Sequence, residues 1–310
     1  MSGDIPGIVI LGPTASGKTR LALALALRFR GEIVSCDALQ VYRHMDIGTA
    51  KASKSEQEQV RHHMLDIRDP DQEFSAGDYQ RMAREAVREI HARGNVPFVA
   101  GGTGFYLRAL IDGLFVGPSR SEPLRERMRK IIRRKGPAVL HRALHRADPE
   151  SAGRISPTDA ERIIRAYEVC LLTGKTMTWW QRQPRDAFDG SRWLKIGINT
   201  PRELLYPKIN QRVDAMFEGG LLDEAGRLLQ RFQKDAHAFK AIGYRQAIAY
   251  LDGTLPLNEA IEETKKESRR YAKRQLTWFR SDPGIVWLDG RLDPGKLEET
   301  AAGLVERWLE

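Results

Sequence analysis

Cysteine is almost missing from this chain. Its 310 residues include only Cys36 and Cys170, which lie far apart and show no CxxC spacing. A disulfide framework and a cysteine zinc site are therefore not expected. The neighbouring pair His62 and His63 offers other zinc ligands, but side chains adjacent in sequence rarely face one metal ion. A structural role is favoured for both histidines.

Long apolar runs are also missing, since no stretch approaches the roughly 20 residues that a membrane span needs. The first residues carry no basic region and lead directly into a strand-like segment, so a secretory signal peptide is not expected. We expect a soluble, cytoplasmic protein without a membrane partner. A monomer is the working expectation, although no residue pattern bears on the oligomeric state.

Acidic residues are outnumbered by basic ones. The chain has 50 Lys and Arg against 41 Asp and Glu, which gives a formal net charge of +9 and a pI near 9.6. Such a charge favours a polyanionic partner, although many basic proteins have none. The position of the charge along the chain must therefore indicate whether such a partner is expected. It gathers in a helical stretch that begins near Pro118 and in the segment from Lys265 to Arg280.

Short apolar segments alternate with helical patterns along much of the chain. Strands are expected at residues 7–11, 32–35, 96–100, 193–198 and 285–288. Helices are expected between the first three of these strands, at residues 18–29 and 76–93. Strands that alternate with helices indicate an α/β fold with a parallel sheet.

The loop after the first strand matches the pattern GxxxxGK[ST] and opens a helix, which is the context that distinguishes a true phosphate-binding loop from a chance match. Backbone N–H groups of such a loop converge on an anion, Lys18 adds a full charge, and the Thr19 hydroxyl can hold Mg²⁺. A glycine turn that binds nothing is the weaker alternative. The residues expected to bind a diphosphate are Gly12, Pro13, Thr14, Ala15, Ser16, Gly17, Lys18 and Thr19.

This loop predicts a P-loop NTPase-like parallel sheet flanked by helices. Because strand patterns return late in the chain, the catalytic core is expected to be discontinuous, with residues 1–117 and 196–310. Residues 118–195 are expected to form an inserted, mainly helical domain, whose first helix is rich in arginine and lysine.

Asp37 follows the second expected strand, at the sheet edge where open α/β folds bind their ligands. We predict that it acts as a general base or contacts the metal ion. The third strand ends in Ala100-Gly101-Gly102 with no acidic residue, which argues against a motor ATPase. The turn that continues to Gly104 offers the Thr103 hydroxyl at the same edge, although a plain loop is an equal alternative.

The segment from Lys265 to Arg280 places several cations on one helical face and interleaves them with Tyr271, Trp278 and Phe279. Aromatic rings beside cations are typical of surfaces that bind single-stranded nucleic acid. A solvated basic face with core aromatics is the alternative, and it is stronger for the aromatics than for the charges.

Five motifs, in order over roughly residues 8–288, resemble those of bacterial tRNA dimethylallyltransferases, also called tRNA isopentenyltransferases. They are the loop GPTASGKT and the segments 37–42 (DALQVY), 45–51 (MDIGTAK), 101–104 (GGTG) and 243–246 (GYRQ). The segment 272–275 (AKRQ) supports the match. Two positions depart from the family pattern: Ala38 stands where serine is common, and Glu161 where glutamine is common.

The resemblance implies transfer of a dimethylallyl group from its diphosphate to N6 of the adenine 3′ of the anticodon, in tRNAs that read codons starting with U. The phosphate loop would hold the diphosphate with Mg²⁺, Asp37 would be the base, and Thr103 and Arg245 would flank the reacting centre. Family members enclose this centre in a channel between core and insertion. Enclosure has a physical reason, because water would otherwise capture an allylic cation-like carbon.

The resemblance also implies two sets of binding residues. The expected contacts to the tRNA anticodon stem-loop are Asp37, Ala38, Leu39, Gln40, Thr103, Arg125, Glu161, Arg162, Ile163, Ile164, Arg165, Lys240, Ala241, Ile242, Gly243, Tyr244 and Arg245. The expected contacts to the metal ion are Thr19 and Asp37.

The main alternative is a P-loop kinase for a small metabolite or nucleoside, since such enzymes share the strand, loop, helix and following aspartate. The basic insertion, the basic late helix and the GGTG turn argue against it, because a small substrate needs none of them. An RNA-associated, NTP-dependent switch is a second alternative, which the missing acidic residue on the third strand disfavours.

Overall fold

The computed structural model describes residues 4–310, which form two compact units. One comprises residues 4–111 and Phe188–Glu310, and the other is the insertion Asp112–Ala187. The insertion thus begins six residues earlier and ends eight residues earlier than the expected range 118–195. The expected range began where the charge changes. The chain leaves the core before that point, in extended segments that pair Phe115 with Arg185.

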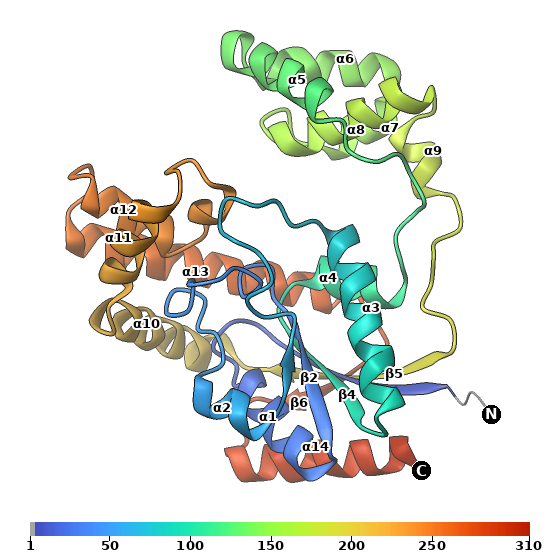
Figure 1. Cartoon of the computed structure of the whole chain (residues 1–310), viewed down its shortest axis with the longest axis vertical. Helices are drawn as coiled ribbons and strands as arrows, with labels where there is room; N and C mark the ends of the chain where they lie inside the picture. Colours follow the sequence, from blue (N-terminus) through green and yellow to red (C-terminus); the bar gives the residue numbers. More distant parts are fainter. Residues whose placement is uncertain (1–3) are drawn as a thin grey trace. The chain divides into compact units, whose positions relative to one another are not determined.

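A six-stranded, fully parallel sheet forms the centre of the core, as the sequence predicts (Figure 1). Its strand order is β3-β2-β4-β1-β5-β6. The strands are β1 (Ile5–Leu11), β2 (Gly31–Cys36), β3 (His62–His63), β4 (Val96–Gly101), β5 (Ser191–Asn199) and β6 (Ile285–Asp289). All five expected strands are present. Strand β3 has only two residues, too few to give a pattern, and β5 includes residues 191–195, which the expected boundary gave to the insertion.

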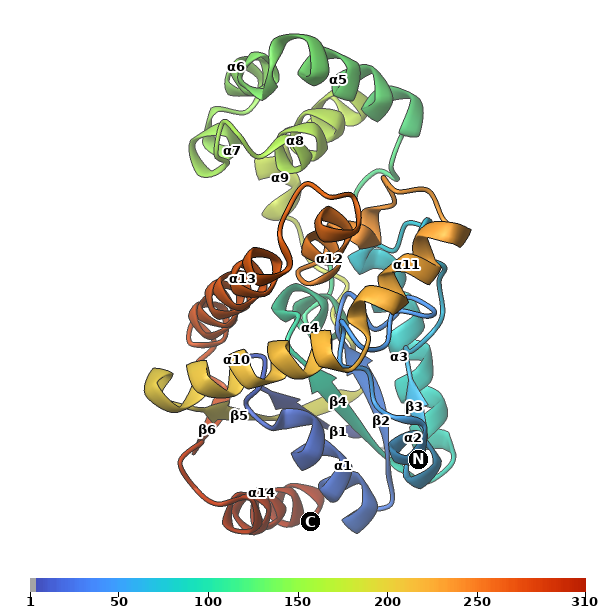
Figure 2. The ribbon, with the colours of Figure 1, turned by 90° about the vertical axis from the view of Figure 1, so that its left-hand side faces the viewer.

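Helices cover both faces of this sheet (Figure 2). The core helices are α1 (Lys18–Arg28), α2 (Lys54–Gln59), α3 (Ala76–Ala92), α4 (Gly104–Ile111), α10 (Arg202–Glu218), α11 (Leu221–Arg231), the 3-10 turn η1 (His237–Lys240), α12 (Tyr244–Leu251), α13 (Leu257–Phe279) and α14 (Pro294–Leu309). Within residues 4–310, every helix is too short or too polar to cross a membrane.

Strand β1 shows why the sequence forms a buried central strand. Successive side chains face opposite sides of a sheet, so Ile8 and Ile10 pack with α1 and α14, whereas Val9 and Leu11 pack in the cluster that contains α3 and α4. Both faces are therefore apolar, and the strand reads as a continuous hydrophobic run, as expected for a parallel sheet.

The carboxyl ends of three neighbouring strands bring the candidate site together. Gly101 at the end of β4 pairs with Leu11 of β1 on one side and with Cys36 of β2 on the other. The phosphate loop, Asp37 and the turn with Thr103 follow these three residues directly. The order of the strands thus places three distant segments at one edge.

The regular elements of the insertion are all helices. It contains α5 (Glu122–Lys135), α6 (Pro137–Ala147), α7 (Pro149–Arg154), α8 (Ala160–Thr173) and α9 (Met177–Gln181). Leu140 and Leu144 of α6 and Ile163 and Ile164 of α8 are buried in its interior. Sixteen of its residues are Lys or Arg and nine are Asp or Glu, so this unit carries seven of the nine net positive charges of the chain.

Gly101 offers a test of how tightly the sheet edge is packed. A Cβ at this position would lie 2.1 Å from the carbonyl oxygen of Cys36, whereas a Cβ at Gly226 in α11 would meet open space. We expect Gly101→Ala to lower the free energy of unfolding by about 3 kcal/mol through overpacking. Gly226→Ala, the matched control, should raise it by about 1 kcal/mol because the unfolded chain loses freedom.

Urea unfolding followed by circular dichroism measures both effects. Equal midpoints for Gly101→Ala and the unsubstituted protein would show that β2 and β4 are not packed this closely.

Candidate active site

The phosphate loop curls over the first turn of α1. Gly17 precedes the helix with φ of 90°, a conformation that favours glycine, and Ser16 N donates a hydrogen bond to the Pro13 carbonyl at 3.3 Å. No described side chain caps the start of α1. Its first N–H groups are therefore available to an anion, and the helix dipole favours negative charge there.

Lys18 lies half-buried at the start of α1 and donates to the Pro13 carbonyl at 3.4 Å. Burial, followed by the charge of the Arg212 guanidinium, lowers the pKa of Lys18 to about 8, whereas Asp37 acts in the opposite direction. The charged form of this side chain is therefore less stable in the free protein than in water. A bound anion would stabilise its charged form.

Arg212 is a member of this cluster that the sequence did not predict. It extends from α10, and burial lowers the pKa of its guanidinium, whereas Asp37 raises it. Within residues 4–310 its guanidinium makes one long hydrogen bond, 3.4 Å to the Thr49 carbonyl. Nothing in the sequence marks it, because it belongs to an ordinary helix with no motif. Two cations and one carboxylate leave a surplus of positive charge at this edge.

Asp37 and Thr103 lie on adjoining segments. Thr103 N donates to the Cys36 carbonyl at 3.1 Å, and the Thr103 hydroxyl accepts from Ala38 N at 3.1 Å. One Asp37 carboxylate oxygen accepts from Leu39 N at 2.9 Å. The carboxylate is half-buried, so it keeps acceptor capacity for a further partner. The structure thus gathers Lys18, Asp37 and Thr103, three of the four expected catalytic residues.

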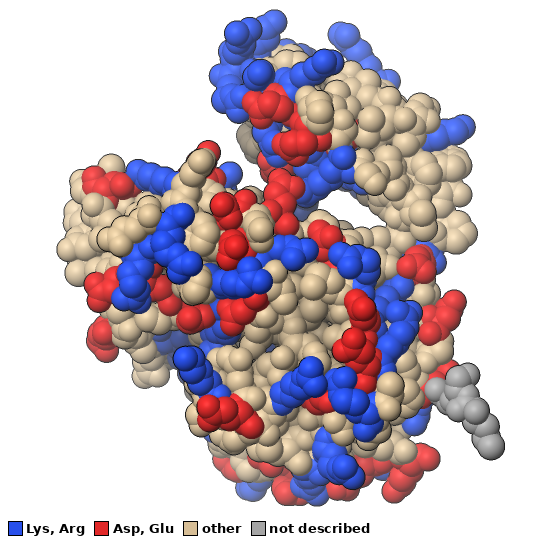
Figure 3. Space-filling model, viewed as in Figure 1, with Lys and Arg blue, Asp and Glu red and all other residues tan. Residues whose placement is uncertain are grey.

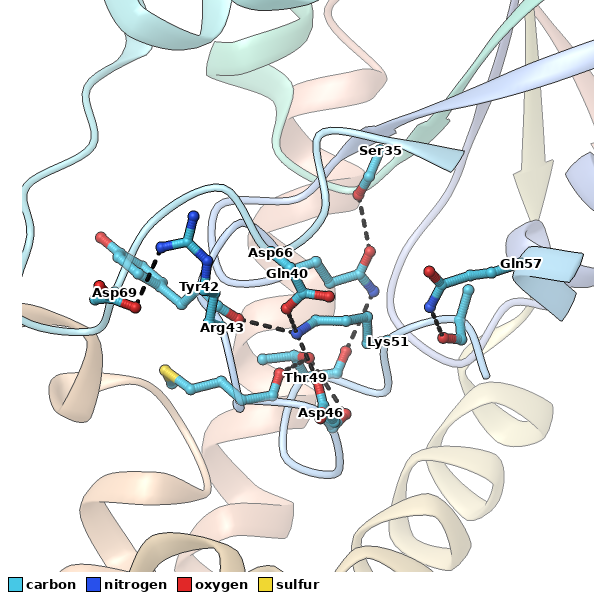
Figure 4. Close-up of polar contacts among 12 residues, drawn as sticks. Ser35, Gln40, Tyr42, Arg43, Asp46, Thr49, Lys51, Gln57, Asp66 and Asp69 are labelled. Carbon is cyan, nitrogen blue, oxygen red and sulfur yellow. Dashed lines mark hydrogen bonds and ion pairs between the residues drawn. The ribbon is translucent and has the colours of Figure 1, made fainter. Parts of the chain in front are cut away.

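The side chain of Gln40 makes hydrogen bonds within the protein (Figure 4). Its amide oxygen accepts from the Ser35 hydroxyl at 2.8 Å, and its amide nitrogen donates to the Ala50 carbonyl at 3.2 Å. Nearby, the buried Lys51 ammonium bonds to Asp46 at 2.5 Å and to Asp66 at 2.7 Å. These contacts hold the irregular segment after Asp37 in place.

The residues expected to contact a metal ion suit one that arrives with a diphosphate. Mg²⁺ usually keeps several waters and binds through one or two carboxylates together with substrate phosphates. Thr19 is exposed beside the loop, and the described residues include no group of three or more His, Cys, Asp or Glu side chains able to hold an ion. The buried Ser16 hydroxyl also has no hydrogen-bond partner within the described chain, as expected of a ligand-binding loop.

Arg245 lies in the first turn of α12, outside the three segments that follow β1, β2 and β4. Its exposed guanidinium is 3.6 Å from the Glu267 carboxylate, and with Lys240 it lines a separate pocket of about 260 Å³. No hydrogen bond or ion pair of the described residues links it to Asp37 or Thr103. The expected catalytic role of Arg245 stays a prediction, and its exposed position beside Lys240 suits an anionic partner.

Tyr244 is fully buried, although the resemblance placed it among the tRNA contacts. Its hydroxyl donates to Glu224 at 2.5 Å, and the same carboxylate accepts from Ile47 N at 2.9 Å and from Asp46 N at 3.1 Å. Tyr244 and Glu224 thus fix the segment 46–48 against α11. The side chain of Tyr244 supports the fold and does not offer a surface.

Several expected tRNA contacts on the insertion are also buried. The Arg125 side chain is 3% exposed and bonds to Glu168 at 2.9 Å, and both Ile163 and Ile164 are core residues. These side chains stabilise the insertion. Arg162 and Glu161 are exposed, and Arg165 partly so. Basic side chains gather over α5 (Figure 3), where the exposed ones are Arg127, Lys130, Arg133, Arg134 and Lys135.

The aromatic residues of α13 differ in exposure, and the alternative of a core position holds for Phe279 only. Phe279 is 2% exposed in the core, and the Trp278 ring lies 4.4 Å from the Arg108 guanidinium and against Gly104. Phe279 is therefore a core residue, whereas Trp278 stays 37% exposed and keeps surface for a further contact. The cations of this helix remain on its outer face, where Lys266, Arg270 and Lys273 are exposed.

Known proteins share this sequence over nearly its whole length. The sequence model of the family described as IPP transferase matches residues 40–282. The tRNA dimethylallyltransferase of Koribacter versatilis is 48% identical over 298 residues, which cover 96% of this chain and 97% of the relative. That of Solibacter usitatus is 47% identical and covers 98% and 99% of the two chains.

Solved structures show the same fold. A tRNA isopentenylpyrophosphate transferase from Bacillus halodurans superposes with a TM-score of 0.71 and 41% identity, over 97% of each chain. A eukaryotic dimethylallyltransferase acting on tRNA gives a TM-score of 0.78 at 29% identity, over 96% of this chain and 77% of that one.

The lowered pKa of Lys18 predicts proton uptake on anion binding. At pH 8.5 the free ammonium is largely deprotonated, and bound pyrophosphate should restore its proton. We expect the protein to take up roughly 0.7 proton more per pyrophosphate than Lys18→Arg, whose side chain is always charged. Calorimetric titration in two buffers of different ionisation enthalpy measures the difference. Equal uptake would show that Lys18 is already charged in the free protein.

Proposed function

Because the chain belongs to the IPP transferase family of tRNA dimethylallyltransferases, we propose that it transfers the dimethylallyl group of dimethylallyl diphosphate to N6 of the adenine 3′ of the anticodon. The tRNAs concerned read codons that start with U. The chain is a prenyltransferase, and the family assignment argues against the alternative of a small-metabolite kinase. Action as a monomer in the cytoplasm stays a prediction.

The reaction makes one bond and breaks one. Adenine N6 attacks C1 of the dimethylallyl group, the C1–O bond breaks with its electron pair passing to the diphosphate, and the N6 proton leaves. Asp37 is proposed as the acceptor of that proton, since its carboxylate lies half-buried at the sheet edge beside Thr103. The Thr103 hydroxyl, bonded to Ala38 N, holds the segment on which Asp37 stands.

The departing diphosphate needs positive charge, because its leaving ability depends on neutralisation of the oxygens. Lys18 and Arg212, whose charges both interact with that of Asp37, are proposed to bind the diphosphate together with the N–H groups at the start of α1. Mg²⁺, when held by the Thr19 hydroxyl and the diphosphate, supplies further charge. A carboxylate bound directly to the metal is a poor base, so Thr19 is the preferred protein ligand and Asp37 is kept for the proton.

The tRNA anticodon stem-loop is proposed to contact the exposed cations of both units. In the insertion these include Arg162 and the arginines and lysines of α5, and in the core they include Lys240 and Arg245. Extraction of an adenine from a single-stranded loop costs a few kcal/mol, less than extraction from a duplex. Phosphate contacts from these cations offset that cost.

One observation carries this proposal: the charges of Lys18 and Arg212 both interact with the carboxylate of Asp37. Two cations that suit a diphosphate thus accompany one carboxylate that suits a proton. A transfer of label tests it. The protein is incubated with unmodified tRNA and Mg²⁺, with either labelled dimethylallyl diphosphate or labelled ATP. Label on tRNA from the prenyl donor is expected. Label transferred only from ATP would overturn the proposal.

Replacement of the base gives a second test. Asp37→Asn keeps the shape of the side chain but removes its proton affinity, so we expect kcat to fall by about 100-fold to 10,000-fold. The dissociation constant for tRNA should change less than threefold, because the charge of one carboxylate contributes little to a polyanionic interface. Single-turnover rates and filter binding measure the two quantities. Unchanged turnover would remove Asp37 as the base.

A further inference from the structure

The side chain of Gln275 on α13 joins the phosphate loop to the turn that carries Thr103. Its amide oxygen accepts a hydrogen bond from Thr14 N at 2.9 Å, and its amide nitrogen donates to the Gly102 carbonyl at 2.9 Å. The residue is 5% exposed. Water therefore cannot easily replace either bond, and loss of one partner would leave a buried backbone group unsatisfied.

Neighbouring residues of α13 fix the helix along the same edge. Tyr271, one turn before Gln275, lies against Thr103, and burial, together with the charge of Asp37, raises its pKa to about 12. Trp278 packs so closely on Gly104 that a Cβ there would come within 2.1 Å of the indole. Gln275 is thus held from both sides on a rigid element and does not depend on a mobile loop.

The two segments that Gln275 connects serve the two halves of the proposed reaction. The loop with Thr14 belongs to the diphosphate side, and the turn after Gly102 leads to Thr103, which bonds to Ala38 beside Asp37. The loop starts from β1 and the turn starts from β4, and these two strands pair directly up to Leu11 and Gly101. The ladder ends at these residues, and Gln275 adds a hydrogen-bonded link between the two irregular segments just beyond it.

Resting on the proposed function, we propose that Gln275 is a positioning residue that fixes the separation between the diphosphate in the loop and the nucleophile at Asp37. It touches neither reacting atom. Its effect comes from geometry, since a displacement of about 1 Å between reacting groups can cost roughly 100-fold in rate. The interaction requires both a donor and an acceptor in one planar group, which an amide supplies and a hydrocarbon does not.

Gln275→Met tests this role with a side chain of similar size. We expect kcat for prenyl transfer to fall about 100-fold, with KM for tRNA and for dimethylallyl diphosphate within threefold of the unsubstituted protein. Thr264→Val on the same helix is the matched control, because the one hydrogen bond of the buried Thr264 hydroxyl within residues 4–310 goes to the Ala260 carbonyl of its own helix. It should keep full kcat.

Gln275→Glu provides a second test, the pH dependence of kcat, which a purely structural role would not change. The protonated acid can accept from Thr14 N and donate to the Gly102 carbonyl, whereas the ionised acid can only accept. Burial should raise the pKa of this introduced acid. We expect the ratio of kcat for Gln275→Glu to that of the unsubstituted protein to rise at least tenfold between pH 8 and pH 6.

The outcomes separate the two proposals. If the unsubstituted protein transfers no prenyl group, the proposed function fails. If it is active and Gln275→Met keeps its kcat, or raises only KM, the positioning role is overturned. Should Gln275→Met fail to fold, as judged by its urea midpoint, the pH dependence of Gln275→Glu decides: a constant ratio overturns the role and a rising ratio supports it.

Discussion

The repulsion between Lys18 and Arg212, partly balanced by Asp37, is the interaction on which the rest of the site depends. Both cations have pKa values lowered by burial, so the fold holds positive charge where water solvates it poorly. One carboxylate does not neutralise two cations. The arrangement therefore suits an anion, and the proposed diphosphate, which gains negative charge as it leaves, would supply what the protein side lacks.

The surrounding fold keeps these charges close without letting them rearrange. Gly101 allows β4 to approach β2 so closely that the two flanking segments share one edge, and Gln275 joins the loop to the turn beyond it. Glu224 fixes the irregular segment after Asp37 by accepting backbone N–H groups. Preorganisation of this kind lowers the cost of reaching the transition state, because the groups need not move when charge develops.

Local patterns explain how much of this could be predicted from the sequence. Hydrophobic runs predict the strands, and glycine spacing predicts the phosphate loop. The position after a strand predicts Asp37, and the structure places all three as these patterns indicate. Arg212 belongs to a helix with no motif. No local signal gives the partners of Gln275, because Thr14 lies 261 positions and Gly102 lies 173 positions before it in the sequence. Motif matching also chose Arg125 and Tyr244, whose burial depends on distant partners that a motif does not reveal.

A structure of the protein with a non-hydrolysable thiolo analogue of dimethylallyl diphosphate and an anticodon stem-loop tests the central claim most directly. The measurement is the position of the two phosphorus atoms and of C1. The account predicts both phosphates within hydrogen-bond distance of the Gly12–Thr19 loop, Lys18 and Arg212, and C1 about 3–3.5 Å from adenine N6. A diphosphate bound away from this loop, or an adenine far from Asp37, would contradict it.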